Sequence, residues 1–524
     1  MMDWSLPYQA QREAVIAKNM VATSQPLAAQ AGIQMLQNGG NAIDAALATA
    51  ITLTVVEACA NGIGGDAFAI VHDGDGLHGL NASGRSPALL TLESVGGKMP
   101  EVGWSPITVP GAVSAWVALH ERFGSLSFDS LFEPAIRYAT DGFHVSRQTA
   151  SRWQAGYARY GHFSSWRDTF LIDGSPPKVG QFVQLLDHAT TLQEIADTKG
   201  ESFYRGDLAQ QIEAAAKSEG GLLRAEDLAS HTCEWVDPLS ISVGDATLYE
   251  LPPNGQGIAA LIALKILQAT DMDLSNCDDP RVIHMQIESM KLAFSDVYAF
   301  LGDPEISGDC ADLLDDNRIS QHASSLIAIA TNVDPEVLPR HSSTVYLATG
   351  DNSGKMVSFI QSNFEGFGSG VVIPNTGIAM QNRGIGFSLD ASHPNCIGPS
   401  KRPYHTIIPA FIEQSGGLNV AFGVMGGHMQ PQGHLQVVCR MIFAGQNPQA
   451  ALDAPRWRLA GGNKVAIEQG WNIDLYDALR IMGHDLEIEE ERSVKFGGGQ
   501  IVYQIDRGYV GASDQRRDGQ ACGV

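Results

Sequence analysis

The sequence predicts an α+β protein built as two lobes, and three observations carry that prediction. The chain has 524 residues, which exceeds the roughly 250–300 residues at which one hydrophobic core usually stops growing. Most of the first part of the chain has apolar residues three and four positions apart, which is typical of helices. From Thr344 onward the pattern changes to short β segments separated by glycine-containing turns.

Two helices and a strand are expected near the start of the chain. Ser24-Gln-Pro26 supplies a cap and a helix-opening proline, and Gly39-Gly40 ends that helix. Apolar residues from 43 to 53 follow helical spacing, and a glycine loop at 59–65 leads into a strand at 67–71. We therefore expect helix, glycine loop and strand to pack closely.

The middle of the chain predicts a helical layer followed by a connector. The expected helices are Ala112–Phe123, Leu131–Tyr138, Ile258–Leu267 and Ile283–Phe300. Residues 309–343 are polar and acidic, without a strong period apart from 326–329. This composition indicates a mobile connector, which is a place where a chain tolerates cleavage.

Short strands are expected in the C-terminal part. The pattern predicts them at Thr344–Thr349, Lys355–Gln361, Thr406–Phe411 and Val420–Val424. The first two flank the turn Gly350-Asp-Asn-Ser-Gly354, so they are expected to form a hairpin.

Composition excludes several classes of function. The formal net charge is −24, which disfavours nucleic acid or an anionic membrane as a partner. No uninterrupted apolar stretch reaches the ~18 residues of a membrane helix, and the first residues do not resemble a secretory signal. Seven scattered cysteines without CxxC spacing favour reduced thiols. We therefore expect a cytoplasmic protein.

The junction of Ser343 and Thr344 is suited to self-cleavage. A polar connector ends at His341-Ser-Ser343, and a threonine then opens a strand. The Thr344 hydroxyl could attack the carbonyl of Ser343 and convert the peptide to an ester that water opens. The new α-amine, with an ordinary pKa of about 7.7–8.0, could then act as the base for its own hydroxyl. The simpler interpretation is a β-branched residue that only begins a strand.

A second candidate is Met425-Gly426-Gly427-His428, which follows a predicted strand. Two residues without side chains let backbone N–H groups approach a developing oxyanion. Alone, this pair is more often only a turn, and the same holds for the glycine loop Phe367–Gly370.

Competing motifs are weaker. Gly62–Gly65 lacks the GxGxxG spacing and follows a helix, and the chain has no GxxxxGK[ST] sequence for phosphates. The histidines do not show the spacing of a zinc site, so we expect them to line a pocket or pack in the core. No metal or organic cofactor is implied, because the nucleophile would carry its own base.

Taken together, the motifs resemble those of the γ-glutamyltransferase (γ-glutamyltranspeptidase) family along nearly the whole chain. The matching segments are Gly39-Gly-Asn-Ala-Ile-Asp-Ala-Ala46, Gly84-Arg-Ser-Pro87, Pro252-Pro-Asn-Gly-Gln-Gly257, Glu288-Ser-Met-Lys-Leu-Ala-Phe294, Phe367-Gly-Ser-Gly370, Lys401-Arg-Pro403 and Asp514-Gln-Arg-Arg-Asp-Gly519.

The resemblance implies an αββα sandwich of the N-terminal-nucleophile (Ntn) hydrolase type with an additional helical lobe. It implies a large subunit, 1–343, and a small subunit, 344–524, that stay associated. Whether such pairs dimerise is left open.

Residue roles follow from the same resemblance. Thr344 occupies the nucleophile position, and Ser362 falls where the family has a hydroxyl beside the nucleophile's amine. Gly426 and Gly427 fall on the oxyanion hole. Arg85 matches the arginine that binds the substrate's carboxylate.

Departures from the family pattern concern the substrate. Gly386 stands where transpeptidases have an aspartate that holds the glutamyl amine, and Asn382-Arg383 precedes it. His405-Thr406 replaces two serines that bind the carboxylate. With the positive charge of Arg383, the pocket is expected to select anions without requiring an amine. This variant resembles the acylase-like and oxamate-amidohydrolase-like branch.

These observations favour an amidohydrolase that cleaves an amide of a small anionic acyl group, oxamate-like or glutaryl-like. One alternative is a true γ-glutamyl hydrolase or transpeptidase that acts on glutathione. Another is an uncleaved, inactive relative that serves as a binding protein. Ser343, a hydroxyl residue one position earlier, is an alternative nucleophile.

Overall fold

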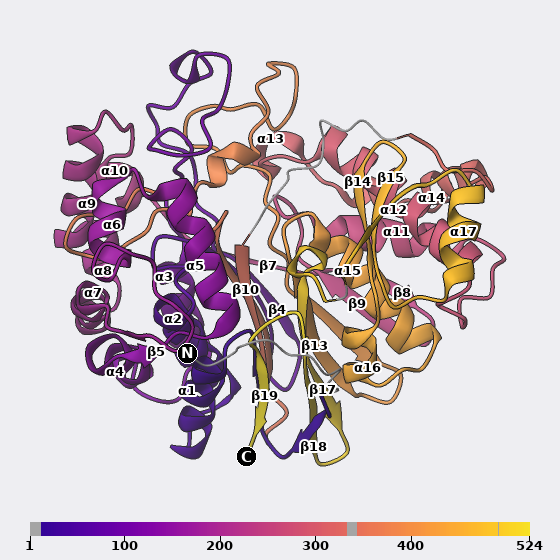
Figure 1. Cartoon of the computed structure of the whole chain (residues 1–524), viewed down its shortest axis with the longest axis horizontal. Helices are drawn as coiled ribbons and strands as arrows, with labels where there is room; N and C mark the ends of the chain where they lie inside the picture. Colours follow the sequence, from indigo (N-terminus) through magenta and orange to yellow (C-terminus); the bar gives the residue numbers. More distant parts are fainter. Residues whose placement is uncertain (1–11, 333–342, 491) are drawn as a thin grey trace.

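Two β-sheets lie face to face in the middle of the molecule, and helices cover both outer faces (Figure 1). The structure is a computed structural model that describes residues 12–332, 343–490 and 492–524. This four-layer αββα sandwich is the predicted Ntn-hydrolase architecture.

The first sheet has the strand order β19-β2-β10-β11-β3-β4-β7. Its neighbours pair antiparallel. The strands are β2 (Met20–Thr23), β3 (Asp66–His72), β4 (Leu77–Asn81), β7 (Glu234–Val236), β10 (Ser343–Gly350), β11 (Met356–Phe364) and β19 (Gln520–Gly523).

The second sheet has the order β1-β18-β17-β13-β12-β9-β8 and is also antiparallel. It contains β1 (Val15–Ala17), β8 (Leu239–Val243), β9 (Ala246–Glu250), β12 (Ala410–Gln414), β13 (Asn419–Met425), β17 (Gly498–Ile505) and β18 (Gly508–Ser513). Each sheet therefore combines strands from before and after the Ser343–Thr344 bond.

Strand β10 shows why the layers form. Successive side chains of a strand point to opposite faces. Tyr346 and Ala348 belong to the apolar cluster between the two sheets, whereas Val345 and Leu347 belong to the cluster beneath the helices on the other face. All four are buried, so β10 reads as a continuous apolar run because both of its faces are covered.

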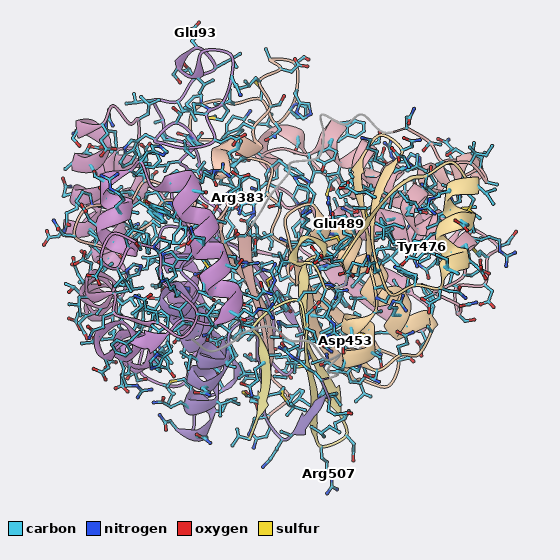
Figure 2. The ribbon with its side chains drawn as sticks, viewed as in Figure 1. Glu93, Arg383, Asp453, Tyr476, Glu489 and Arg507 are labelled. Carbon is cyan, nitrogen blue, oxygen red and sulfur yellow. The ribbon has the colours of Figure 1, made fainter. Side chains whose placement is uncertain are left out.

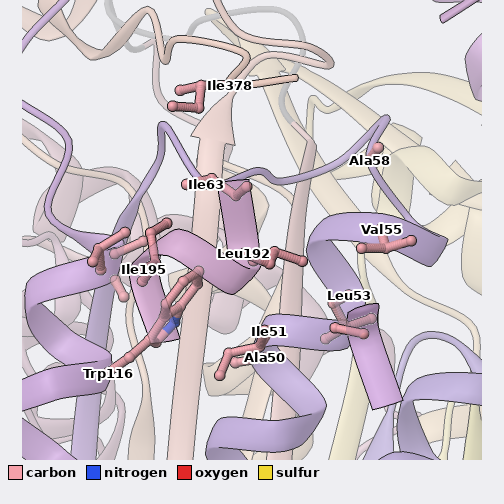
Figure 3. Packing of buried hydrophobic residues seen from close by; sticks show 14 of the residues in the cluster. Ala50, Ile51, Leu53, Val55, Ala58, Ile63, Trp116, Leu192, Ile195 and Ile378 are labelled. Carbon is pink, nitrogen blue, oxygen red and sulfur yellow. The ribbon is translucent and has the colours of Figure 1, made fainter. Parts of the chain in front are cut away.

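The helical layer on the first sheet is centred on α1 (Pro26–Gln37) and α2 (Ala42–Val56). Every residue of α2 is buried; Figure 3 shows several of them packed with Trp116, Leu192 and Ile195. The additional helical lobe comprises α3 (Ala112–Phe123), α4 (Glu133–Asp141), α5 (Arg147–Tyr160), α6 (Ser164–Phe170), α7 (Leu186–Thr198), α8 (Glu201–Arg205), α9 (Asp207–Ser218) and α10 (Ala225–Ala229).

The layer on the second sheet consists mainly of α11 (Gly257–Gln268), α12 (Pro280–Phe300) and α15 (Met429–Val438), which share one apolar cluster with β12 and β13. Outside them lies a three-stranded sheet of β14 (Trp457–Gly461), β15 (Lys464–Glu468) and β16 (Asp485–Glu489), next to α17 (Ile473–Ile481). The short helices α13 (Pro304–Ser307) and α16 (Pro448–Asp453) complete this side.

Most predicted elements are found within a few residues of their expected bounds, including α3, α11, β10, β11 and β13. The strand expected at 406–411 begins only at Ala410, because residues 406–409 run as a loop.

The expected connector at 309–343 needs a correction. A 3₁₀ turn at Ala311–Leu314 and helix α14 (Asp316–Ser325) occupy its first half, capped by the side chain of Asp315. Ile319 is the one buried residue of this helix, so the sequence has no repeating apolar spacing there that would predict a helix. Residues 333–342 of the expected connector lie outside the described residues.

Within the described ranges, no helix is both long enough and apolar enough to cross a membrane.

Candidate active site

The β10–β11 hairpin places Thr344 at the end of the first sheet. Gly354 has φ +89°, and its N–H donates to Asp351, which closes the turn that pairs the two strands. The pairing register shifts between Ser343 and Val345, so two residues of β11, Ser362 and Asn363, face Thr344 across a β-bulge. Bulges often re-aim a side chain beside an active site.

Ser362 links the two residues of the expected cleavage site. The Thr344 hydroxyl donates to Ser362 Oγ at 3.2 Å, and the Ser362 hydroxyl donates to the carbonyl oxygen of Ser343 at 2.9 Å. The N–H of Phe364 donates to the same Ser362 oxygen at 2.8 Å and fixes it. The hydroxyl expected to attack and the carbonyl expected to be attacked thus share one buried partner.

Gly426 and Gly427 follow β13 directly and open onto a pocket of ≈ 710 Å³ that Ser343 also lines. Their φ angles are +136° and +62°, values that favour glycine. A Cβ on Gly426 would lie 3.1 Å from Gly497 Cα. The structure therefore brings the two predicted oxyanion-hole glycines to the same pocket as the expected cleavage site.

Arg383 is a buried cation with open donors. Its Nη1 donates to the Thr406 hydroxyl at 2.8 Å, and its guanidinium lies 4.4 Å from the ring centroid of Phe364, which lines the pocket. Arg383, labelled in Figure 2, is fully buried. Burial lowers the pKa of Arg383 to about 9, although the negative charges of Asp66 and Glu365 act to raise it. Its Nε and Nη2 have no hydrogen-bond partner among the described residues.

Phe364 itself adopts φ +76°. A bulky residue in this region is strained, and such strain gathers at functional sites. The sequence did not single out Phe364, because a phenylalanine gives no local signal of a positive φ.

Asn382 holds an acidic pocket residue in place. Its Nδ2 donates to Glu365 Oε2 at 3.1 Å and to the Glu101 carbonyl at 2.9 Å. Glu365 lines the pocket and accepts from Arg159 at 2.6 Å. Burial raises the pKa of the Glu365 carboxyl. Asn382 therefore reaches the pocket through Glu365.

His405 is engaged on both ring nitrogens. Its Nε2 lies 3.0 Å from Asp66 Oδ2, and its Nδ1 accepts from the N–H of Ile407 at 3.4 Å. Burial and the charge of Arg383 lower the His405 pKa well below its usual range, and burial raises the Asp66 pKa to about 7. Asp66 pairs with Ser362 in the sheet register, so this pair supports the site from behind.

Arg85 is held by two carboxylates. Its Nη1 is 2.9 Å from Asp303, and its Nη2 is 2.6 Å from Glu305. Arg85 is not among the described residues that line the pocket with Gly426 and Gly427, and neither are Arg383 and Thr406. In this arrangement two carboxylates already occupy its guanidinium.

Gln256 connects Thr406, which is predicted to bind the substrate, to Gly427. Gly427 and Gly426 form the predicted oxyanion hole and are called the oxyanion turn below. Its Nε2 donates to the carbonyls of Thr406 at 2.6 Å and Gly427 at 2.8 Å. The motif Pro252–Gly257 marked this region in the sequence, but the spacing gave no sign of its partners.

One group in the described part of the chain could hold a metal: His284, Glu288 and His484, all buried. Both Glu288 oxygens are already used. Lys291 Nζ lies 2.7 Å from one of them, and Thr331 donates to the other. The ammonium of Lys291 would repel a cation there.

Comparison with known proteins shows the family of the chain. The profile described as Gamma-glutamyltranspeptidase matches residues 28–524. The chain is 34% identical to the Glutathione hydrolase-like YwrD proenzyme of Bacillus subtilis, over 97% of this chain and 98% of that protein. It is 33% identical to the Oxamate amidohydrolase proenzyme of Klebsiella pneumoniae, over 97% and 99%.

The fold is similar to the crystal structure of cephalosporin acylase from Bacillus halodurans. The TM-score is 0.95 at 46% identity, covering 100% of this chain and 99% of that one. The profile match over nearly the full length, two relatives above 30% identity and this shared Ntn fold all point to one family. The chain therefore belongs to the gamma-glutamyltranspeptidase family and is an Ntn-type amide hydrolase or transferase.

Proposed function

We propose that the chain is a precursor that cuts its own Ser343–Thr344 bond and then hydrolyses an amide of a small anionic acyl group. The observation that carries this proposal is the Ser362 bridge, which joins the Thr344 hydroxyl to the Ser343 carbonyl. The same bridge favours Thr344 over Ser343 as the nucleophile, because the carbonyl it contacts belongs to the Ser343–Thr344 peptide.

Self-cleavage begins when Thr344 Oγ attacks the carbonyl carbon of Ser343. The C–N bond breaks, the Thr344 nitrogen gains a proton, and an ester joins the two parts. Ser362 donates to the carbonyl oxygen as negative charge develops on it. Water then opens the ester and leaves Thr344 as a free amino terminus.

Turnover uses the same hydroxyl. The α-amine of Thr344 takes the hydroxyl proton as Oγ attacks the substrate amide, and it returns that proton to the leaving amine. The backbone N–H groups of Gly426 and Gly427 stabilise the oxyanion, a contribution of about 10²–10³ in rate for one donor. Water then deacylates Thr344.

The acyl group is anchored by charge. Arg383 presents two open donors next to Thr406 in the interior, and an unpaired buried cation is costly unless a ligand pairs with it. A carboxylate on the acyl group satisfies those donors, and the Thr406 hydroxyl is placed to share it. Arg85 stays a second candidate anchor, although Asp303 and Glu305 occupy it in this arrangement.

The two products of cleavage, 1–343 and 344–524, would remain associated. Both sheets mix strands from the two parts, with β10 and β11 paired to β2 and β3. Separation of the two parts would expose the apolar cluster between the sheets to water. Exposure costs a free energy of roughly 25 cal/mol for every Å² of apolar surface.

A substrate comparison tests the acyl assignment. Glutaryl p-nitroanilide and γ-glutamyl p-nitroanilide differ only in the α-amine, so their ratio of kcat/KM isolates the amine requirement. We expect the glutaryl compound or oxamate to be cleaved at least about tenfold better, with no turnover by Thr344→Ala. Preference for the γ-glutamyl compound would instead indicate an enzyme that acts on glutathione.

A further inference from the structure

His428 directly follows the oxyanion turn and lines the same pocket as Ser343, Gly426 and Gly427. It is 7% exposed. Its Nε2 is buried and has no hydrogen-bond partner among the described residues. A buried polar atom without a protein partner beside a pocket can hydrogen-bond to water or to a bound group there.

The ring of His428 is held firmly on its other side. Its Nδ1 lies 2.5 Å from the hydroxyl of Tyr298. The ring stacks on Tyr404, with centroids 5.9 Å apart and planes 12° from parallel. The orientation of Nε2 is therefore set by α12, which carries Tyr298, and by the loop that carries Tyr404.

The groups around Tyr298 bear on which nitrogen of the His428 ring carries the proton. Gln256 Nε2 faces two carbonyls, which only accept, so Gln256 Oε1 must face Tyr404. The Tyr404 hydroxyl donates to that oxygen at 2.6 Å, so toward the neighbouring Tyr298, whose ring centroid lies 5.6 Å away, the Tyr404 oxygen can only accept.

We infer that the Tyr298 proton points to this Tyr404 oxygen, so that the Tyr298 oxygen accepts from His428 Nδ1–H. The lone pair of a neutral imidazole is thus left on His428 Nε2. Burial and the charge of Arg383 lower the pKa of His428 to about 3, so the ring stays neutral near neutral pH.

A lone pair in this position restricts what His428 can bind. It repels an oxyanion and a carboxylate, so it serves neither the oxyanion hole nor the acyl anchor. It requires an O–H or N–H donor. Once the acyl group is on Thr344 and the amine has left, the attacking water is the group that brings such a donor.

We propose that His428 Nε2 positions the water that deacylates Thr344, an inference that rests on the proposed acyl-enzyme. The water oxygen forms a bond to the ester carbonyl carbon, and the bond from that carbon to Thr344 Oγ breaks. One water proton passes to the Thr344 amine and from there to Oγ. The other hydrogen stays on the former water oxygen and keeps its hydrogen bond to His428 Nε2, which takes no proton.

The test compares wild type with His428→Ala and His428→Gln, using whichever of glutaryl or γ-glutamyl p-nitroanilide wild type cleaves faster. His144→Gln makes the same histidine-to-glutamine change at an exposed residue of the helical lobe and is the control. Complete self-cleavage of each variant, followed by intact mass, reports that the fold is kept.

We expect His428→Ala to lower kcat by about tenfold or more and KM in proportion, so that kcat/KM is unchanged. A burst of p-nitroaniline should appear, and the small subunit should carry the acyl mass at steady state. Gln can supply an acceptor oxygen, so His428→Gln should recover part of kcat.

Unchanged kcat with no acyl adduct in a self-cleaved His428→Ala would overturn this inference and leave the proposed function intact. A fall in kcat/KM without a burst would overturn it too, since that pattern belongs to acylation. A wild type that never self-cleaves would overturn both proposals together.

Discussion

The hydroxyl of Ser362 lies 2.9 Å from the carbonyl oxygen of Ser343 and donates to it across the β10–β11 hairpin. The same oxygen atom of Ser362 accepts from the Thr344 hydroxyl. One side chain therefore orients the attacking group and polarises the carbonyl it would attack, before any bond is broken.

Replacing Ser362 should slow self-cleavage. Ser362→Ala removes the donor to the Ser343 carbonyl, so the rate of cleavage should fall by about 10²-fold, followed as the loss of full-length chain with time. Ser362→Thr keeps the hydroxyl and should cleave normally. Ser358→Ala removes another buried hydroxyl of β11, which bonds Tyr346 and Phe422, and its cleavage rate should match wild type. Equal rates for Ser362→Ala and Ser358→Ala would refute the role of Ser362.

The two arginines can be separated by their effect on KM. Arg383→Gln removes the buried cation beside Thr406 and should raise KM for an anionic acyl substrate by about 10–100-fold, the value of a charge-assisted hydrogen bond. Arg85→Gln removes a cation that two carboxylates already occupy, so its KM should rise less. The reverse order would assign the carboxylate to Arg85.

The oxyanion turn should not tolerate a side chain. Gly426→Ala places a Cβ at φ +136° and 3.1 Å from Gly497 Cα. The backbone must shift, and kcat of processed enzyme should fall by about 10²-fold or more. Gly445 also has positive φ, at +62°, but a Cβ there would meet no atom within 4 Å. Gly445→Ala therefore controls for backbone strain alone and should keep wild-type kcat.

Acid should destabilise the fold partly through His188. Burial lowers the pKa of His188 to about 4 in the folded chain, below the unfolded value of about 6.5. The unfolded chain therefore binds this proton first. The stabilisation from His188 is full above pH ~6.5 and is lost as pH falls toward 4, at most about 3 kcal/mol.

In a Tm series from pH 7.5 to pH 5, His188→Gln should lose less stability than wild type. His144→Gln, at an exposed histidine, should follow the wild-type curve. Parallel curves for wild type and His188→Gln would show that His188 does not titrate in this way.

Local patterns predicted the elements that hold the proposed catalytic residues. The turn at 350–354 fixes the register of the hairpin, and that register places Ser362 beside Thr344. The Gly426–Gly427 pair follows a clearly apolar strand. Both features depend on neighbours in sequence, so the sequence alone could place them.

Contacts between distant segments were beyond such patterns. Asp66 reaches His405 across 339 positions, and Asp303 reaches Arg85 across 218. No spacing rule shows that His405 has both nitrogens engaged or that Arg383 retains open donors. The positive φ of Phe364 is likewise imposed by the folded site, since a phenylalanine gives no local signal for it.

The most direct test of the central claim is intact-mass measurement with N-terminal sequencing of wild type and Thr344→Ala. The account predicts two fragments in wild type, the smaller beginning Thr-Val-Tyr-Leu, and one uncut 524-residue chain in the variant. A smaller fragment that begins at Ser343 would move the nucleophile by one residue. A single uncut chain in active wild type would contradict the self-processing mechanism.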